Sequence, residues 1–165
     1  MLWHLMRRRI YIPLSGIRLV GLFVFVWMVL PAGAQTTPGS QACQGSTVDL
    51  QGADFAQKSR VFLTGLQNAV KSDDKARVAA MSSYPLLVIH GDRKTRIKTK
   101  AEVLGQYDAI FDAHVRQAIA QQSAKCLFGN YQGAMIGDGE IWFREQPNGT
   151  MKIVTVNRSA GSNSL

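Results

Sequence analysis

The sequence contains little that marks a known catalytic or metal-binding chemistry. Two cysteines among 165 residues are too few for a disulfide-dense scaffold. It holds no recognisable metal-ligand cluster, phosphate-binding loop or nucleophile constellation. Hydrophobic residues nevertheless make up 46% of the chain, which excludes an intrinsically disordered protein. The length is that of one folded domain, so the sequence predicts its fold more directly than its chemistry.

Acidic residues are absent from the first 34 positions. These positions hold four arginines, which account for half of the formal net charge of +8. An apolar run follows over residues 19–30, and small residues stand at Ala32 and Ala34. A basic lead, a short apolar stretch and small residues before a cleavage point are typical of a secretory signal peptide. We therefore predict a signal peptide over 1–34, cleavage after Ala34, and a periplasmic or secreted protein.

Two alternatives exist for this N-terminal segment. An uncleaved membrane anchor would need about 20 apolar residues, whereas the run has 12, and an anchor would leave the Ala32 and Ala34 pair unexplained. The arginines before Ile10 and Tyr11 faintly suggest a twin-arginine signal, but the Phe- and Trp-rich run favours the general secretory route. We expect no stable membrane anchor after cleavage.

Export determines how the two cysteines are interpreted. In an oxidising compartment Cys43 and Cys126 can form a disulfide bond. The bond would close a loop of 82 residues, which the chain-entropy model predicts to stabilise the fold by about 4 kcal/mol, less any strain. The alternative is a pair of free buried thiols, and the predicted export favours the bond.

The first half of the mature chain is predicted to hold two helices and then two strands. Apolar residues at helical spacing predict the first helix. Ser72 as a hydroxyl cap, followed by the acidic pair Asp73-Asp74 in the first turn, predicts a short second helix. Pro85 favours an extended run after it. The predicted ranges are 54–71 for the first helix and 86–90 and 93–98 for the strands.

A long helix and three strands are predicted for the second half. A capping box, Thr99 to Glu102, predicts the start of a helix that ends near Gln122. Strands are expected over 127–136, 140–145 and 150–157, because Asp-Gly and Asn-Gly turns separate them. The order α-α-β-β-α-β-β-β predicts an α+β fold with an antiparallel meander. The apolar face of the long helix would contain Val103, Leu104, Tyr107, Ile110, Phe111, Val115 and Ala118.

Flanking segments complete the predicted organisation. Small polar residues predict a flexible arm over 35–53, and the last residues predict a disordered tail over 159–165. The folded domain is then expected over 54–158.

Three segments carry a resemblance to a known family. They are Tyr84-Pro85-Leu86, Ile97–Glu102 running into Tyr107–Phe111, and Gly133–Phe143. With the element order, they resemble the nuclear transport factor 2-like (cystatin-like cone) superfamily, most closely its uncharacterised exported bacterial members. The resemblance implies a curved sheet wrapped around the long helix, a pocket between them and a possible homodimer. It does not identify an activity, because the superfamily holds isomerases, hydrolases, cyclases, transport factors and inactive binding proteins.

His114 is the best candidate for catalysis. It follows Ile110 by four residues and Tyr107 by seven, so it is expected inside the apolar face of the long helix. An imidazole near a tyrosine hydroxyl could act as general acid or base. The alternative is a buried histidine that bonds a backbone carbonyl and specifies packing. This alternative is favoured, because no acidic partner is visible on that face.

Carboxylates occur in two further places, and we expect no metal or cofactor at either. Asp108, Asp112 and Arg116 are spaced four apart, which favours a solvated ladder of ion pairs on the polar side of the helix. Asp138 and Glu140 flank Gly139, and two carboxylates without further oxygen ligands indicate a turn rather than a calcium site.

A basic stripe is the densest group of charges. If residues 94–100 are extended, Lys94, Arg96, Lys98 and Lys100 share one face. The stripe could bind an anion or an acidic protein surface. It could also protect a sheet edge against aggregation, and this interpretation is favoured. Nucleic acid is a poor partner, because the protein is exported and the stripe has no interleaved aromatic residues.

Tyr131 and Trp142 lie on the central predicted strands. Such aromatic residues either fill the core or line a ligand pocket, and core is the default. Together with Tyr107 and His114 they are the candidate ligand-binding residues.

Three hypotheses for function follow. The leading one is an exported, non-catalytic protein that binds a small molecule or protein partner at a pocket between the long helix and the sheet. The second is a small-molecule hydrolase or isomerase of the cyclase-like type that uses His114 and Tyr107. The third is a partner-occluding protein, of the immunity type, that uses the stripe over residues 93–100.

Overall fold

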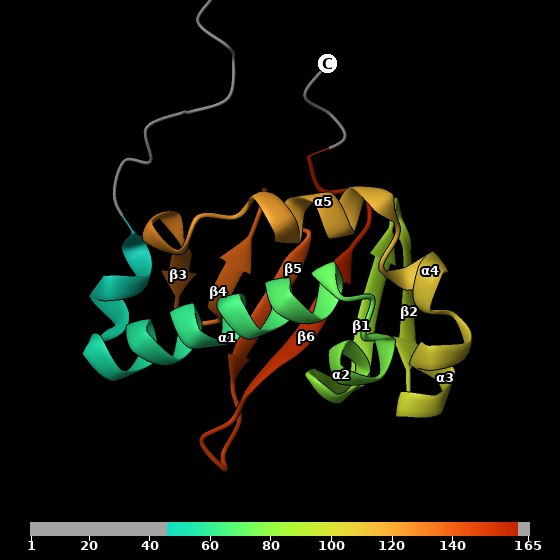
Figure 1. Ribbon diagram of the computed structural model, residues 1–165, viewed down its shortest axis with the longest axis horizontal. Coiled ribbons are helices and arrows are strands. Elements are labelled where there is room, and N and C mark those ends of the chain that lie inside the picture. Colours follow the sequence, from blue (N-terminus) through green and yellow to red (C-terminus); the bar gives the residue numbers. More distant parts are fainter. Residues whose placement is uncertain (1–45, 162–165) are drawn as a thin grey trace, which may run out of the picture. The chain divides into compact units, whose positions relative to one another are not determined.

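The computed structural model of the chain describes residues 46–161. These residues form an α+β fold, as predicted, with helices packed against a six-stranded sheet (Figure 1). The helices are η1 (Thr47–Gln51), α1 (Ala53–Lys71), α2 (Lys75–Ala80), α3 (Lys100–Gly105), α4 (Tyr107–Ile110), α5 (Ala113–Gln121) and η2 (Ala124–Cys126). The strands are β1 (Ser82–His90), β2 (Arg93–Ile97), β3 (Phe128–Asn130), β4 (Gly133–Ile136), β5 (Ile141–Glu145) and β6 (Met151–Asn157).

The sheet is mixed, with the strand order β2-β1-β6-β5-β4-β3. The meander β3 to β6 is antiparallel, as predicted, and β1 pairs with β2 in the same sense. β1 and β6 are parallel neighbours, which joins the N-terminal hairpin to the C-terminal meander. The last strand therefore lies in the centre of the sheet, and β2 and β3 are its edges.

The longest described helix is α1, which crosses in front of the strands in Figure 1. Its apolar residues recur at helical spacing, so Leu63 and Leu66 are fully buried. Phe62 stacks on Phe143 of β5 with 4.7 Å between ring centroids. This contact fixes α1 on the sheet. The sequence predicts that the helix beginning after Thr99, rather than α1, is the long helix packed on the sheet.

The prediction of one long helix after Thr99 is wrong. The Thr99 cap is present, because its hydroxyl accepts a hydrogen bond from the Glu102 amide over 3.2 Å. The helical segment is nevertheless divided into α3, α4 and α5. The last break occurs at Asp112, whose carboxylate accepts a bond from the Val115 amide over 3.0 Å. An aspartate that caps a new helix competes with continuation of the old one.

The predicted strand over 127–136 is a hairpin rather than one strand. It is divided into β3 and β4 at Tyr131 and Gln132. The Asn130 side chain accepts a hydrogen bond from the Gln132 amide over 2.8 Å, which is the local bonding that favours a turn. Tyr131 is consequently at the tip of a turn and 91% exposed.

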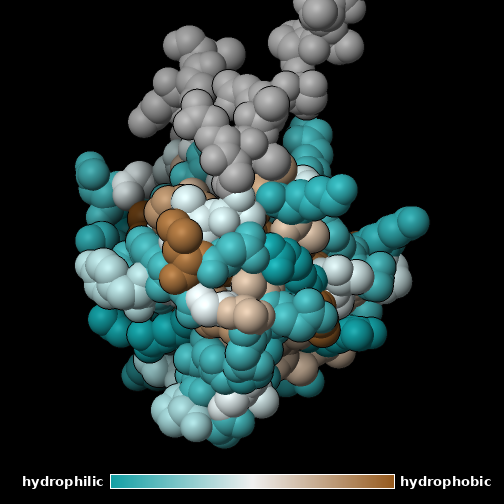
Figure 2. Space-filling model, turned by 90° about the vertical axis from the view of Figure 1, so that its left-hand side faces the viewer, coloured by the Kyte–Doolittle hydropathy of each residue, from teal (hydrophilic) through white to brown (hydrophobic). Residues whose placement is uncertain are grey.

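The end of the predicted arm is packed onto the sheet. Val48 of η1 is fully buried, and its amide donates to the Leu127 carbonyl over 3.3 Å. Thr47 bonds both backbone groups of Gly129 in β3, so η1 covers this edge of the sheet. Figure 2 shows that end of the molecule, whose surface is mostly hydrophilic with small separate hydrophobic areas. The predicted signal peptide, Cys43 and the start of the predicted arm lie outside the described residues.

Candidate functional site

The face of the sheet opposite α1 is hollowed. A hollow of about 490 Å³ lies on it, lined by strand and turn residues alone; we call it the strand-face hollow. Its apolar lining includes Leu87, Ile89, Trp142 and Val154. These side chains are only partly buried, because they alternate with the core residues along each strand. The volume is within the range of small-molecule sites.

The register of the strands explains which side chains meet in the strand-face hollow. Leu87, Thr155 and Trp142 are direct partners across β1, β6 and β5, and directly paired residues project on the same face. The pairing of β5 with β6 shifts register after Trp142. The extra residue is Val154, so a bulge directs a further apolar side chain into the hollow.

Positive charge surrounds the strand-face hollow. Arg144 lines it, and Lys94 and Arg96 of the edge strand β2 pair with its lining residues Ile89 and Leu87. No ion pair joins these three cations to an acid of residues 46–161. The strand residues that project on this face include no acid within the described chain. The hollow is therefore apolar in its centre and cationic at its margins.

A second hollow adjoins the first at Arg144. It has about 880 Å³ and lies between the start of α1 and the β3–β4 turn. Tyr131, Gln132 and Arg144 line both hollows. Gly52 precedes α1 without a side-chain cap, so the positive end of this helix dipole faces the second hollow. Asp54 and Glu145 also line it, and both bond Lys58.

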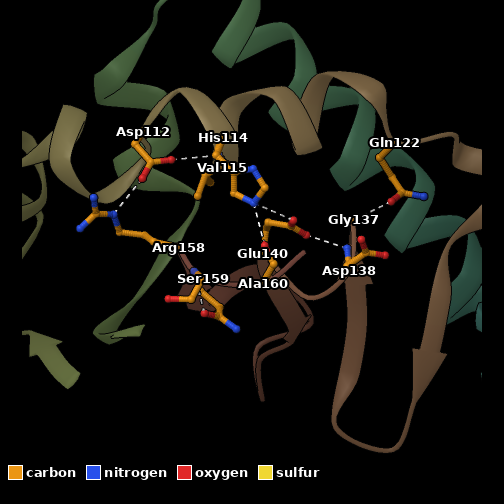
Figure 3. A network of polar contacts seen from close by, with 11 residues as sticks. Asp112, His114, Val115, Gln122, Gly137, Asp138, Glu140, Arg158, Ser159 and Ala160 are labelled. Carbon is orange, nitrogen blue, oxygen red and sulfur yellow. Dashed lines mark hydrogen bonds and ion pairs between the residues drawn. The ribbon is translucent and has the colours of Figure 1, made fainter. Parts of the chain in front are cut away.

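His114 belongs to a different region, a polar network at the C-terminal end of the described chain (Figure 3). The ring is 44% exposed rather than buried as predicted. The new helix α5 turns Val115 and Ile119 toward the core, so the adjacent His114 lies outside the buried face. Its Nε2 atom lies 2.7 Å from the Ala160 carbonyl and 3.0 Å from the Glu140 carboxylate. Both neighbours are acceptors, so Nε2 carries the hydrogen.

Glu140 is the buried acid of this network and was not predicted as a partner of His114. It is 3% exposed, and its second carboxylate oxygen accepts a hydrogen bond from the Asp138 amide over 2.6 Å. The Glu140 backbone carbonyl accepts a bond from the Asn157 amide over 2.8 Å. The network therefore ties α5, the β4–β5 turn and the chain after β6 together. The predicted tail begins inside it, since Ser159 and Ala160 are held there.

The predicted ladder of Asp108, Asp112 and Arg116 is not formed as expected. Asp112 caps α5 and pairs with Arg158 over 2.9 Å, while Asp108 pairs with Arg116 and Lys75. Burial raises the pKa of Asp112, but the Val115 amide and Arg158 lower it by more. Both aspartates are thus held by ion pairs, and no group of residues suited to a metal ion occurs among residues 46–161.

Tyr107 and His114 do not form an acid–base pair. Tyr107 is 2% exposed and stacks on Phe111 with 5.1 Å between ring centroids. Its hydroxyl has no hydrogen-bond partner within the described chain, and burial raises its pKa to about 12. The residue therefore belongs to the core on the helix side of the sheet.

We expect Tyr107→Phe to leave stability at neutral pH unchanged or to raise it by up to about 1 kcal/mol, because it removes a buried hydroxyl without a partner. The unfolded chain ionises this tyrosine near pH 10 and the folded chain near pH 12. The native protein should therefore lose up to about 2 kcal/mol more than the variant between these pH values. Urea unfolding at both ends of this range checks the effect. A loss of more than about 1 kcal/mol at neutral pH would contradict it.

The remaining candidate residues lie in separate places. Tyr131 and Trp142 meet at the strand-face hollow, although the sequence favoured the core for both. Lys98 and Lys100 lie beyond the end of β2, the latter as the first residue of α3. Cys126 is not a free thiol, and its predicted partner Cys43 lies outside the described residues, so the pairing stays a prediction.

No described helix is long and apolar enough to cross a bilayer. Comparisons of the chain with protein-family models, with curated proteins and with solved structures found no match.

Proposed function

We propose that this protein is an exported, non-catalytic binding protein whose ligand occupies the strand-face hollow. The observation that carries the proposal is the half-buried apolar lining on a sheet face that no described helix covers at the hollow. Binding sites are typically concave and mostly apolar, with a few polar groups that orient the ligand. Leu87, Trp142 and Val154 supply the apolar part here, and Thr155, Asn157 and Arg144 the polar part.

The proposed site differs from the one that the sequence suggested. On the helix side of the sheet Val115 and Ile119 of α5 are fully buried together with Ile136 of β4. Neither hollow described above is lined by a residue of α3, α4 or α5. The mixed sheet with its antiparallel meander supports a nuclear transport factor 2-like fold, which we propose for residues 46–161. Within that fold the interior is packed, and the exposed sheet face carries the hollow.

Catalysis at His114 is the rival hypothesis, and Glu140 supplies the acid that it lacked. The contacts nevertheless favour a structural role. Nε2 already donates to two acceptors, and neither hollow is lined by His114. Lys94 and Arg96 of the basic stripe belong to the edge strand β2, which supports the edge-protection interpretation. We therefore assign ligand binding to the hollow and protection of the edge to the stripe, whose Lys94 and Arg96 also border the hollow.

The uncharged dye Nile red tests the proposed function. We expect the full chain to bind the dye, and Leu87→Gln to weaken this binding about fivefold, since loss of roughly 1 kcal/mol of apolar contact corresponds to that factor. Dye fluorescence is the readout. Val61→Gln is the matched control, because Val61 of α1 is 62% exposed and lines neither hollow.

Equal dye binding by the native chain and Leu87→Gln would place the dye elsewhere and refute the site. Failure of the native chain to bind, with elution as a dimer, would indicate that a second copy covers the sheet face.

A further inference from the structure

We propose that the ligand of the strand-face hollow is an amphipathic anion, with an apolar body and one carboxylate or phosphate group. This inference rests on the proposed function and concerns the chemistry of the ligand. It follows from the distribution of charge over the two faces of the sheet.

Several cations of the helices are paired with acids, whereas the cations on the strand side face no acid of the described chain. Lys58, Arg60 and Lys75 of the helices each pair with an aspartate or glutamate. Arg144, Lys94 and Arg96 project on the opposite face and have no such pair within residues 46–161. A surface of one sign attracts the opposite charge. A ligand for this face therefore carries negative charge.

Arg144 is the residue best placed to hold the charged group. It lines both the strand-face hollow, whose centre is apolar, and the adjoining second hollow, whose lining has more polar residues. A guanidinium presents a fork of donors that matches carboxylate and phosphate oxygens. The uncapped start of α1 borders the same place, where the carboxylates of Asp54 and Glu145 are both paired with Lys58, and the helix dipole adds attraction for an anion. Lys94 and Arg96 contribute from the β2 side.

The apolar centre requires the rest of the ligand to be apolar. Leu87, Val154 and the Trp142 ring line the hollow between the β2 cations and Arg144. Inorganic phosphate alone would leave these side chains in water. A second copy of the chain would bring two cationic faces together, and such like-charge contacts are unfavourable. An amphipathic anion satisfies both parts of the surface.

Trp142 allows binding to be measured at the site itself. The chain has three tryptophans, Trp3, Trp27 and Trp142, so W3F and W27F together leave Trp142 as the single reporter in the full chain. The probes are decanoate, decanol and decyltrimethylammonium, which share one chain length and differ in charge, each used below its micelle concentration. We expect Trp142 emission to report decanoate binding about tenfold tighter than decanol binding, with the cation weakest.

Arg144→Gln should abolish the preference for decanoate and leave the affinity for decanol unchanged. Arg77→Gln is the matched control, because Arg77 belongs to α2 and its loss lowers the net charge equally. A preference that survives Arg144→Gln, or that Arg77→Gln removes equally, would overturn the assignment.

The outcomes also separate this inference from the proposed function. Equal affinity for the three probes, or binding of Nile red at Leu87 without any binding of decanoate, would refute the anionic ligand and leave the site intact. Absence of a Trp142 response to the probes and to Nile red would refute both.

Discussion

Glu140→Ala is expected to lower the free energy of unfolding by about 2 kcal/mol, because removing a buried hydrogen-bond acceptor leaves the donors that face it unsatisfied. The carboxylate is 3% exposed and binds the His114 ring on one oxygen and the Asp138 amide on the other. Without it, the Asp138 amide loses its acceptor, and the His114 ring keeps only the Ala160 carbonyl. The turn before β5 and the chain after β6 should loosen together, since the network joins them.

A double-mutant cycle measures the contact itself. His114→Ala alone should cost about 1–3 kcal/mol, and the double variant less than the sum of the single ones, since each removes the same contact. Urea unfolding gives all four values. Asp92→Ala is the control: this residue is exposed in the β1–β2 turn, and its change should stay within about 0.5 kcal/mol.

Ligand binding provides a second readout of the same variants. If the network is structural, His114→Ala should bind Nile red as the native chain does under conditions in which it is folded. Additive energies in the cycle would show that His114 and Glu140 do not interact. A loss of a catalytic activity on His114→Ala, with stability unchanged, would favour the enzyme hypothesis instead.

Gly133→Ala is expected to cost about 3 kcal/mol or more. Gly133 begins β4 with φ at +136°, a conformation that residues with a side chain rarely adopt. A methyl group there would clash with the Phe143 carbonyl oxygen and would approach the Arg144 Cβ atom to 3.0 Å. Both neighbours are in β5, so the added group would press the β3–β4 hairpin away from the sheet.

Gly105→Ala is the matched control for this prediction. An added methyl group at Gly105 has no atom within 4 Å, and alanine should stabilise this helical position by roughly 0.5–1 kcal/mol. Thermal or urea unfolding of the two variants gives the comparison. If Gly133→Ala were as stable as the native chain, the described backbone at β4 would be wrong.

Those parts of the fold that depend on local bonding could be predicted from the sequence. The Thr99 cap bonds an amide three residues away, and α1 shows its apolar spacing within its own residues. The break between α4 and α5 at Asp112 has a local cause as well, since Asp112 caps α5. In the sequence, however, an aspartate that caps a new helix and an aspartate that forms an i, i+4 ion pair within one long helix look the same. Asp112 pairs with Arg158, which is 46 residues away in the chain, and this partner could not be identified from the local sequence.

The candidate site was only partly predictable for the same reason. Tyr131 and Trp142 were selected as aromatic residues on strands, and the structure places both at the strand-face hollow. Arg144 was not selected, because an arginine in a strand has the pattern of any solvated charge. Arg144 lines both hollows only because β5 pairs with β6 and the β3–β4 turn lies next to it. From its place beside Gly139, Glu140 has the pattern of a turn residue, and its contact with His114 exists only in the folded chain.

The amide chemical shifts of the full chain during titration with decanoate test the central claim most directly. We predict that the largest changes occur in β1, β5 and β6 around Leu87, Trp142 and Val154, and that α5 around Val115 changes little. Changes concentrated on α3 to α5, with the three strands unaffected, would show that the ligand enters the helix side of the sheet and would contradict the account.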